Sequence, residues 1–162
     1  MIKRLMICGH SGHGKDQFAE FLKLKFASSS HVALDHCVWH KWGIFNGYVD
    51  KEECFNDRRN HMQAWFDEIA AFNEDDPARL GRLIFKENPV YVGCRKKEEF
   101  EAIRNEGLFD ISIWIDASLR KPAQPISSCS VTPDICNVVI RNNGTLKELK
   151  ARTLAFKKVV GL

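Results

Sequence analysis

The stretch Gly9-His10-Ser11-Gly12-His13-Gly14-Lys15 lies close to the start of the chain and decides its fold. An apolar run, Leu5-Met6-Ile7-Cys8, leads into it, and residues with the spacing of an amphipathic helix follow it. The glycines and the lysine have the spacing G-x-x-x-x-G-K between a predicted strand and a predicted helix. This arrangement is the signature of a phosphate-binding loop, or P-loop.

Each part of this loop has a physical task. Glycines adopt positive φ angles and let successive backbone N–H groups converge on one anion. The N-terminus of the following helix adds a partial positive charge, and the ammonium of Lys15, which we expect to be catalytic, can reach β- and γ-phosphates. Asp16 stands where this motif usually carries Ser or Thr. The residues expected to bind phosphates are Gly9, His10, Ser11, Gly12, His13, Gly14, Lys15 and Asp16.

The composition is ordinary for a globular protein. The 162 residues suffice for one domain with a sizeable core, and the net charge of +3 is compatible with a polyanionic ligand. The first apolar run is too short for a signal peptide and no apolar stretch could span a membrane, so we expect a cytoplasmic protein without a membrane partner. The six cysteines form no C-x-x-C pair, which favours reduced thiols over a zinc site.

Apolar runs that alternate with helical patterns predict a single α/β domain over residues 1–162. The expected strands cover residues 2–8, 90–93, 111–115 and 138–140. The expected helices cover residues 15–26, 51–73, 77–88, 96–105 and 146–159. The segment Val32-Ala33-Leu34 fits either a short second strand or the beginning of a helix. The alternation predicts three layers, with a parallel sheet covered by helices on both faces.

Three polar residues are expected at the carboxyl edge of this sheet, where ligands bind in open parallel sheets. Arg95 follows the strand 90–93 and would contact the transferred phosphate or the acceptor, unless it is a surface arginine. Asp116 ends the next strand, where it either faces the site or caps a turn. Asp35 follows the ambiguous segment and is the candidate base that would take a proton from a hydroxyl acceptor, unless it caps a helix.

Further candidates lie outside the sheet. The segment 31–88 is expected to be a helical acceptor-binding region, whose arginines suit bidentate recognition of phosphate unless they are solvated surface charges. These arginines are Arg58, Arg59, Arg79 and Arg82. The loop 117–133, rich in proline and serine, is expected to form a reduced lid that carries Arg120. Asn143 belongs to an Asn-Asn-Gly turn that either lines an adenine pocket or is a plain turn.

The stretch 7–16 resembles the G-K-D variant of the P-loop found in phage-type deoxynucleoside monophosphate kinases. The segment 138–149 is similar to that family's closing strand, asparagine–glycine turn and helix, and the stretches 76–81 and 93–95 are similar to elements of compact phage relatives. The resemblance implies a P-loop NTPase fold, phosphoryl transfer, and ATP and Mg²⁺ as cosubstrates.

The chain departs from this family at one position that bears on the metal. The related kinases usually carry an aspartate where this chain has Gly93. The Mg²⁺ ion is therefore expected on Asp16 or Asp35, with Asp116 or water as the alternatives.

The sequence thus predicts an ATP-dependent kinase with a nucleotide-type acceptor, and the first choice is a (deoxy)nucleoside monophosphate. Similar compact kinases in phages that hypermodify their DNA phosphorylate a hydroxymethylated pyrimidine, such as 5-hydroxymethyluracil, within the duplex. In this alternative, DNA is the substrate, and Asp35 is the base that takes the proton from the hydroxyl group. A third alternative is a nucleotide-binding regulator that does not catalyse. A phage-encoded protein would act in the host cytoplasm.

Overall fold

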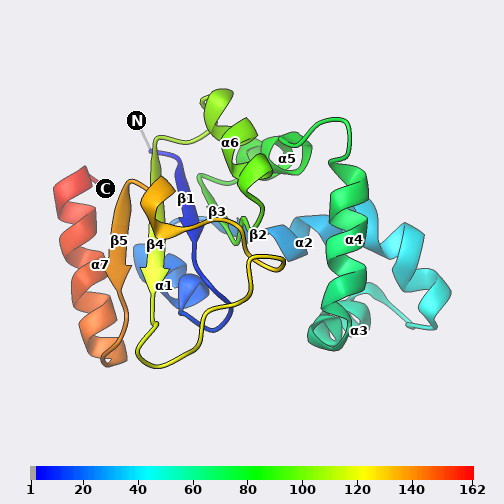
Figure 1. The fold of residues 1–162 in the computed structure, drawn as a ribbon, viewed down its shortest axis with the longest axis horizontal. Helices are drawn as coiled ribbons and strands as arrows, with labels where there is room; N and C mark the ends of the chain where they lie inside the picture. Colours follow the sequence, from blue (N-terminus) through cyan, green and yellow to red (C-terminus); the bar gives the residue numbers. More distant parts are fainter. Residues whose placement is uncertain (1–2) are drawn as a thin grey trace.

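The computed structural model describes residues 3–162 and contains a five-stranded parallel sheet (Figure 1). Its order is β2-β3-β1-β4-β5. The strands are β1 (Leu5–Cys8), β2 (Phe26–Ser28), β3 (Val90–Val92), β4 (Ile111–Asp116) and β5 (Val138–Arg141). The predicted α/β fold is confirmed. The first strand, expected at 2–8, begins at Leu5, and residue 2 lies outside the described range.

Strand β1 lies in the middle of the sheet because its side chains are apolar on both faces. All four of its residues are fully buried. Ile7 pairs with Val92 of β3 on one side and with Ile113 of β4 on the other. Apolar strands without alternation are typical of parallel sheets covered on both faces. The loop that follows Cys8 is thereby placed at the centre of the carboxyl edge.

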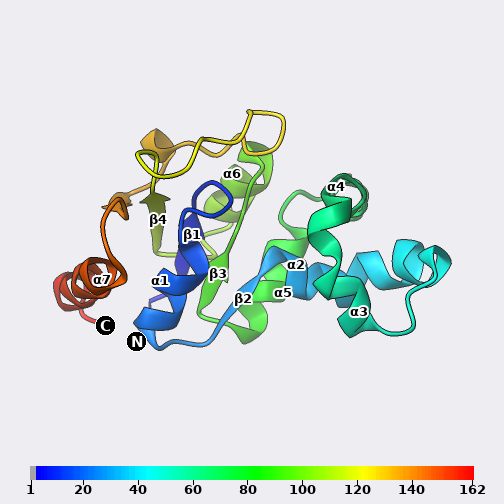
Figure 2. The ribbon, with the colours of Figure 1, turned by 90° about the horizontal axis from the view of Figure 1, so that it is seen from below.

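Helices cover both faces of the sheet, which confirms the three predicted layers (Figure 2). The helices of these layers are α1 (Lys15–Leu22), α5 (Arg79–Glu87), α6 (Lys97–Asn105) and α7 (Leu146–Val160). On one face α1 packs against α7, with the ring centroids of Phe18 and Phe156 5.9 Å apart. On the other face α5 and α6 bury apolar side chains against Met6, Tyr91 and Trp114 of the sheet.

A helical region follows β2 and extends beyond that edge of the sheet (Figures 1 and 2). It contains α2 (Ser29–Ala33), the π-helix η1 (Leu34–Gly43), the 3₁₀ turn η2 (Ile44–Asn46), α3 (Lys51–Asn56), the 3₁₀ turn η3 (Arg58–His61) and α4 (Met62–Phe72). A further 3₁₀ turn, η4 (Pro133–Ile135), precedes β5. The helix expected over 51–73 is therefore divided into three pieces. Trp65 of α4 is buried and packs against Phe55 of α3, which joins two of these pieces.

The structure corrects the expected end of the first helix and the position of the second strand. Helix α1 ends at Leu22, because Lys23 adopts the left-handed conformation with φ +57°. Phe26, expected on that helix, lies in β2 and pairs with Val90. Strand β2 ends at Ser28 because helix α2 begins directly after it. The Ser28 hydroxyl accepts a hydrogen bond from the His31 backbone N–H and caps α2.

The helix expected over 77–88 begins at Arg79 in the structure, and the Asp76 carboxylate pairs with Arg82. Thr145 caps α7, since its hydroxyl accepts from the Glu148 N–H at 3.2 Å. The six cysteines are free thiols. Within residues 3–162, no helix has the length and apolarity needed to cross a membrane.

Candidate active site

The P-loop runs from the end of β1 into α1, and its shape depends on Gly14. This residue has φ +96° and lies directly before Lys15, the first residue of α1. A Cβ at this position would clash with the side-chain amide of Asn142. Both the backbone conformation and the close approach therefore require glycine. The buried Asn142 amide donates to the His13 carbonyl at 2.9 Å, which fixes the loop to the end of β5.

The side chain of His13 fixes the other side of the loop. It is fully buried, and its Nδ1 accepts a hydrogen bond from the Ala117 N–H at 3.0 Å. Its Nε2 lies 3.2 Å from the Lys121 carbonyl oxygen, so this network requires the proton to be on Nε2. His10 packs edge-on against Trp114, with ring centroids 5.1 Å apart. The two histidines connect the P-loop to β4 and to the loop after it.

Lys15 lies inside the concavity that the loop forms. Its Nζ donates to the His10 carbonyl at 2.9 Å, and only 8% of the residue is exposed. Burial lowers the pKa of Lys15 to about 8, and repulsion from Arg95 acts in the same direction. A phosphate bound here would replace the carbonyl as the partner of the ammonium and would favour its charged form.

A cavity of about 540 Å³ opens from the P-loop toward the helical region, and we call it the P-loop cavity. The P-loop and α1 contribute Ser11, Gly12, Lys15, Asp16 and Glu20. Arg58 and Arg59 of η3 face them, and Arg95 lies at the end of β3. Four cationic side chains thus share this space with two carboxylates, those of Asp16 and Glu20. Arginine next to a P-loop is suited to bidentate contact with phosphate oxygens.

Gln124 occupies part of this space with a neutral oxygen. Its Oε1 accepts from the Ser11 backbone N–H at 2.8 Å and from Nη1 of Arg95 at 2.7 Å. Its own backbone N–H donates to Nδ1 of His10 at 3.1 Å. One amide oxygen therefore lies between two donors that converge as they would on a phosphate oxygen. Gln124 belongs to the predicted lid loop 117–133, and this contact holds that loop over the P-loop.

Two of the four predicted acceptor-binding arginines lie elsewhere. Arg79 pairs with Asp75 at 2.9 Å, and Arg82 pairs with Asp76 and, at 3.1 Å, with Glu106. Neither lines the P-loop cavity. These two arginines lie on α5, which covers the sheet face, whereas η3 faces the P-loop across the cavity. Their expected binding role is not supported by their position.

Asp35 is also placed away from the P-loop cavity, which corrects its expected role as base and metal ligand. Its carboxylate accepts from Nζ of Lys51 at 2.7 Å, and it lines a different cavity, beside His36 and Lys86. The physical reason is the position of the second strand. Because β2 ends at Ser28, the serines 28–30 occupy the sheet edge where Asp35 was expected.

Three further predicted site residues, Arg120, Asn143 and Asp116, make hydrogen bonds within the fold and do not line the P-loop cavity. Arg120 Nε donates to the Asn142 carbonyl at 2.8 Å, and Asn143 Oδ1 accepts from the Leu119 N–H at 3.0 Å. Asp116 Oδ1 accepts from the Ser118 N–H at 3.0 Å, so it caps a turn. The expected adenine contact of Asn143 thus has a structural alternative.

Sequence reasoning missed Gln124, Asn142 and the serines 28–30. Gln124 lies in a loop without periodic pattern, far along the chain from Ser11, so no local spacing relates the two. The Asn-Asn-Gly turn was recognised, but only the structure shows that its first asparagine, and not its second, contacts the P-loop.

Comparison with known proteins supports the fold. A sugar kinase from Janibacter sp. HTCC2649 aligns over 98% of this chain and 96% of its own, with 14% sequence identity and a TM-score of 0.50. A gluconokinase from Sinorhizobium meliloti 1021 aligns over 98% of this chain and 93% of its own, with 16% identity and a TM-score of 0.50. By sequence, the chain matches no family model and no curated protein. At such identities the likeness establishes the fold, which is the α/β P-loop fold of these two structures.

The position of Gln124 predicts that it competes with anions. Removing its side chain in Gln124→Ala frees the Ser11 N–H and Arg95, so we expect tripolyphosphate to bind roughly fivefold more tightly, the equivalent of about one hydrogen bond. Isothermal titration calorimetry measures this affinity. Gln63→Ala, which removes an exposed contact with Asp67 on α4, is the matched control and should bind like the unmodified protein. Equal or weaker binding by Gln124→Ala would show that Gln124 does not compete.

Proposed function

We propose that this protein is an ATP-dependent kinase whose acceptor carries a phosphate group, with a (deoxy)nucleoside monophosphate as the first choice. The observation that carries this proposal is the P-loop cavity, in which Lys15 and the P-loop share one space with Arg58, Arg59 and Arg95. A kinase with a phosphate acceptor must hold phosphates of two different molecules against each other, and their combined negative charge requires such a concentration of cations.

A phosphate acceptor needs cations close to the P-loop and no strong base. The oxygen of a phosphate acceptor is already an anion and can attack the γ-phosphate without losing a proton. Arg95 comes from the end of β3 and Arg58 from η3, so they approach the P-loop from two sides. Arg58 is held in place by the Phe55 carbonyl at 2.9 Å, which leaves its other N–H groups for a ligand.

The residues present are suited to Mg²⁺ delivered with ATP. Within residues 3–162, no cluster of three or more His, Cys, Asp or Glu side chains could hold a metal. Asp16 provides one exposed carboxylate at the P-loop cavity, and Mg²⁺ is typically held by one or two carboxylates, water and substrate phosphates. Bound there, the ion would neutralise charge on the transferred phosphoryl group. Asp35 takes no part in this site.

A hydroxyl acceptor is the second candidate, and the names of the two structural neighbours suggest it. The two structural neighbours are named as a sugar kinase and a gluconokinase. With Asp35 placed elsewhere, the carboxylates available to take a proton from a hydroxyl at the P-loop cavity are those of Asp16 and Glu20. A hydroxymethylated pyrimidine in DNA would need the same proton transfer.

An acceptor panel tests the proposal. We expect acceptor-dependent release of ADP from ATP and Mg²⁺ with at least one deoxynucleoside monophosphate, measured with a coupled assay. Parallel reactions contain gluconate, simple sugars and duplex DNA carrying hydroxymethyluracil. Turnover with only a sugar, gluconate or the DNA would replace the first choice, and tight ATP binding without any turnover would indicate a regulator.

The arginines provide a matched pair of variants. Arg58→Ala removes a cation from the P-loop cavity and should lower kcat/KM for the acceptor by roughly 10- to 100-fold, because a hydrogen bond to a charged group is lost. Arg79→Ala removes an arginine that pairs with Asp75 outside the cavity and should leave kcat/KM within about twofold. Equal losses in both variants would contradict the assigned position of the acceptor.

The lowered pKa of Lys15 predicts the pH dependence of ATP binding. Because the pKa is about 8, the ammonium is mostly present below that pH and is lost above it in the free protein. The Kd for ATP should therefore rise as the pH increases from about 7 to about 9. Lys15→Arg keeps its charge over this range and should show a flatter profile. Parallel profiles for the two proteins would show that titration of Lys15 does not control binding.

A further inference from the structure

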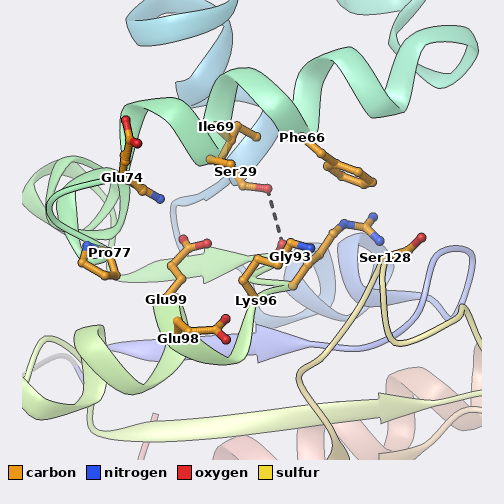
Figure 3. A pocket seen from close by; sticks show the side chains of 13 residues that line it. Ser29, Phe66, Ile69, Glu74, Pro77, Gly93, Lys96, Glu98, Glu99 and Ser128 are labelled. Carbon is orange, nitrogen blue, oxygen red and sulfur yellow. Dashed lines mark hydrogen bonds between the residues drawn. The ribbon is translucent and has the colours of Figure 1, made fainter.

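A second cavity of about 460 Å³ adjoins the P-loop cavity (Figure 3). It lies between α4 and the segment that runs from the end of β3 into α6, and we call it the α4 cavity. Both cavities are lined by Ser29, Phe66, Gly93, Arg95 and Ser128. These shared residues form the boundary at which one cavity passes into the other. A single ligand can therefore have one end in each cavity.

The two sides of the α4 cavity differ in polarity. Phe66, Ile69 and Ala70 recur at helical spacing along one face of α4 and form an apolar wall. The opposite side is polar and carries the carboxyl groups of Glu98 and Glu99. An apolar wall that faces a few fixed polar groups is typical of a small-molecule site.

The α4 cavity and the P-loop cavity also differ in charge. Three carboxyl groups and one ammonium line the α4 cavity, those of Glu74, Glu98, Glu99 and Lys96, and the ammonium donates to the Ser127 carbonyl at 2.9 Å. Lys15, Arg58 and Arg59 line only the P-loop cavity. At the boundary, the guanidinium of Arg95 lies 5.6 Å from the centroid of the Phe66 ring. A ligand that fits this distribution has an anionic end, an apolar or flat body, and a hydrogen-bond donor at its far end.

Glu99 is the buried polar group of the α4 cavity. Only 6% of it is exposed, and one oxygen, Oε1, accepts from the hydroxyl of the fully buried Tyr91 at 2.6 Å. Burial raises the pKa of Glu99 to about 7, although the hydrogen bond from Tyr91 opposes this effect. Figure 3 shows its carboxyl group pointing toward α4, between Pro77 and Gly93. Because Tyr91 engages one oxygen, the other is available to a ligand.

We propose that the α4 cavity holds the base of the acceptor nucleotide, and that Glu99 determines specificity by accepting a hydrogen bond from an amino group on that base. This inference rests on the proposed function, since the nucleotide's phosphate must lie in the P-loop cavity. Phe66 and Ile69 provide the apolar surface against which a flat ring packs. The ring's edge then faces Glu99.

The chemistry of the carboxyl group sets the order of preference among bases. Above its pKa of about 7 the carboxyl group of Glu99 is ionised, and a carboxylate accepts hydrogen bonds and repels carbonyl oxygens. Cytosine and adenine carry an exocyclic amino group at a place where thymine, uracil and guanine carry a carbonyl. A buried site built for a donor rejects a ligand that lacks it, because its polar group is left unpaired. Nucleotides of cytosine and adenine are therefore the preferred acceptors.

Glu99→Gln tests this assignment because it preserves shape. In this variant the amide oxygen retains the hydrogen bond from Tyr91, so the amide N–H₂ faces the cavity and now favours a carbonyl. We expect the ratio of kcat/KM for dCMP over dTMP to fall by roughly 10- to 100-fold, while the Kd for ATP is unchanged. Glu101→Gln on the exposed side of α6 is the matched control and should keep the ratio of the unmodified protein.

A second variant approaches the α4 cavity from the opposite wall and does not touch Glu99. Ala70 is exposed on α4, so Ala70→Phe fills the cavity with little effect on the fold. It should raise KM for every nucleotide acceptor at least tenfold without changing the Kd for ATP. Nucleotide turnover with an unchanged base ratio in Glu99→Gln, or an unchanged acceptor KM in Ala70→Phe, would overturn this inference and leave the proposed function standing. Turnover with no nucleotide at all would overturn the proposed function first.

Discussion

The contact between Gly14 and Asn142 is the constraint on which the rest of the site depends. The amide of Asn142 holds the His13 carbonyl and occupies the space where any larger residue at position 14 would place its Cβ. The loop is therefore fixed from outside, by the end of β5, and not only by its own sequence. A loop held in this way loses little entropy when an anion binds, because its backbone is already fixed.

From this fixed loop, the arrangement of charge follows along the carboxyl edge of the sheet. The P-loop cavity brings Lys15 together with arginines from η3 and from the segment after β3, and the carboxyl groups of α6 line the adjoining α4 cavity. The two cavities adjoin because β3 is the strand next to β1. The order of the strands thus places the cations of the P-loop cavity beside the carboxyl groups of the α4 cavity, which is the arrangement that the proposed nucleotide acceptor requires.

The sequence was informative where local patterns determine structure. The G-x-x-x-x-G-K spacing and the apolar strand before it predicted the fold and the P-loop, because both depend on neighbours in the chain. Position 35 was misjudged because the short strand 26–28 has no alternation that separates it from the end of a helix. Arg58 and Arg79 look equivalent in the sequence, and only their tertiary partners distinguish them. The contact of Gln124 with Ser11 joins distant segments, so no local pattern could reveal it.

The central claim is that the main-chain N–H groups of the loop after β1 hold the phosphates of ATP. The most direct measurement is a titration of ¹⁵N-labelled protein with ATP and Mg²⁺, followed through the backbone amide resonances. The account predicts that the largest shifts occur at Gly12, His13, Gly14 and Lys15, and that they saturate together. Saturable binding that leaves these four amides unmoved and shifts resonances elsewhere would contradict it.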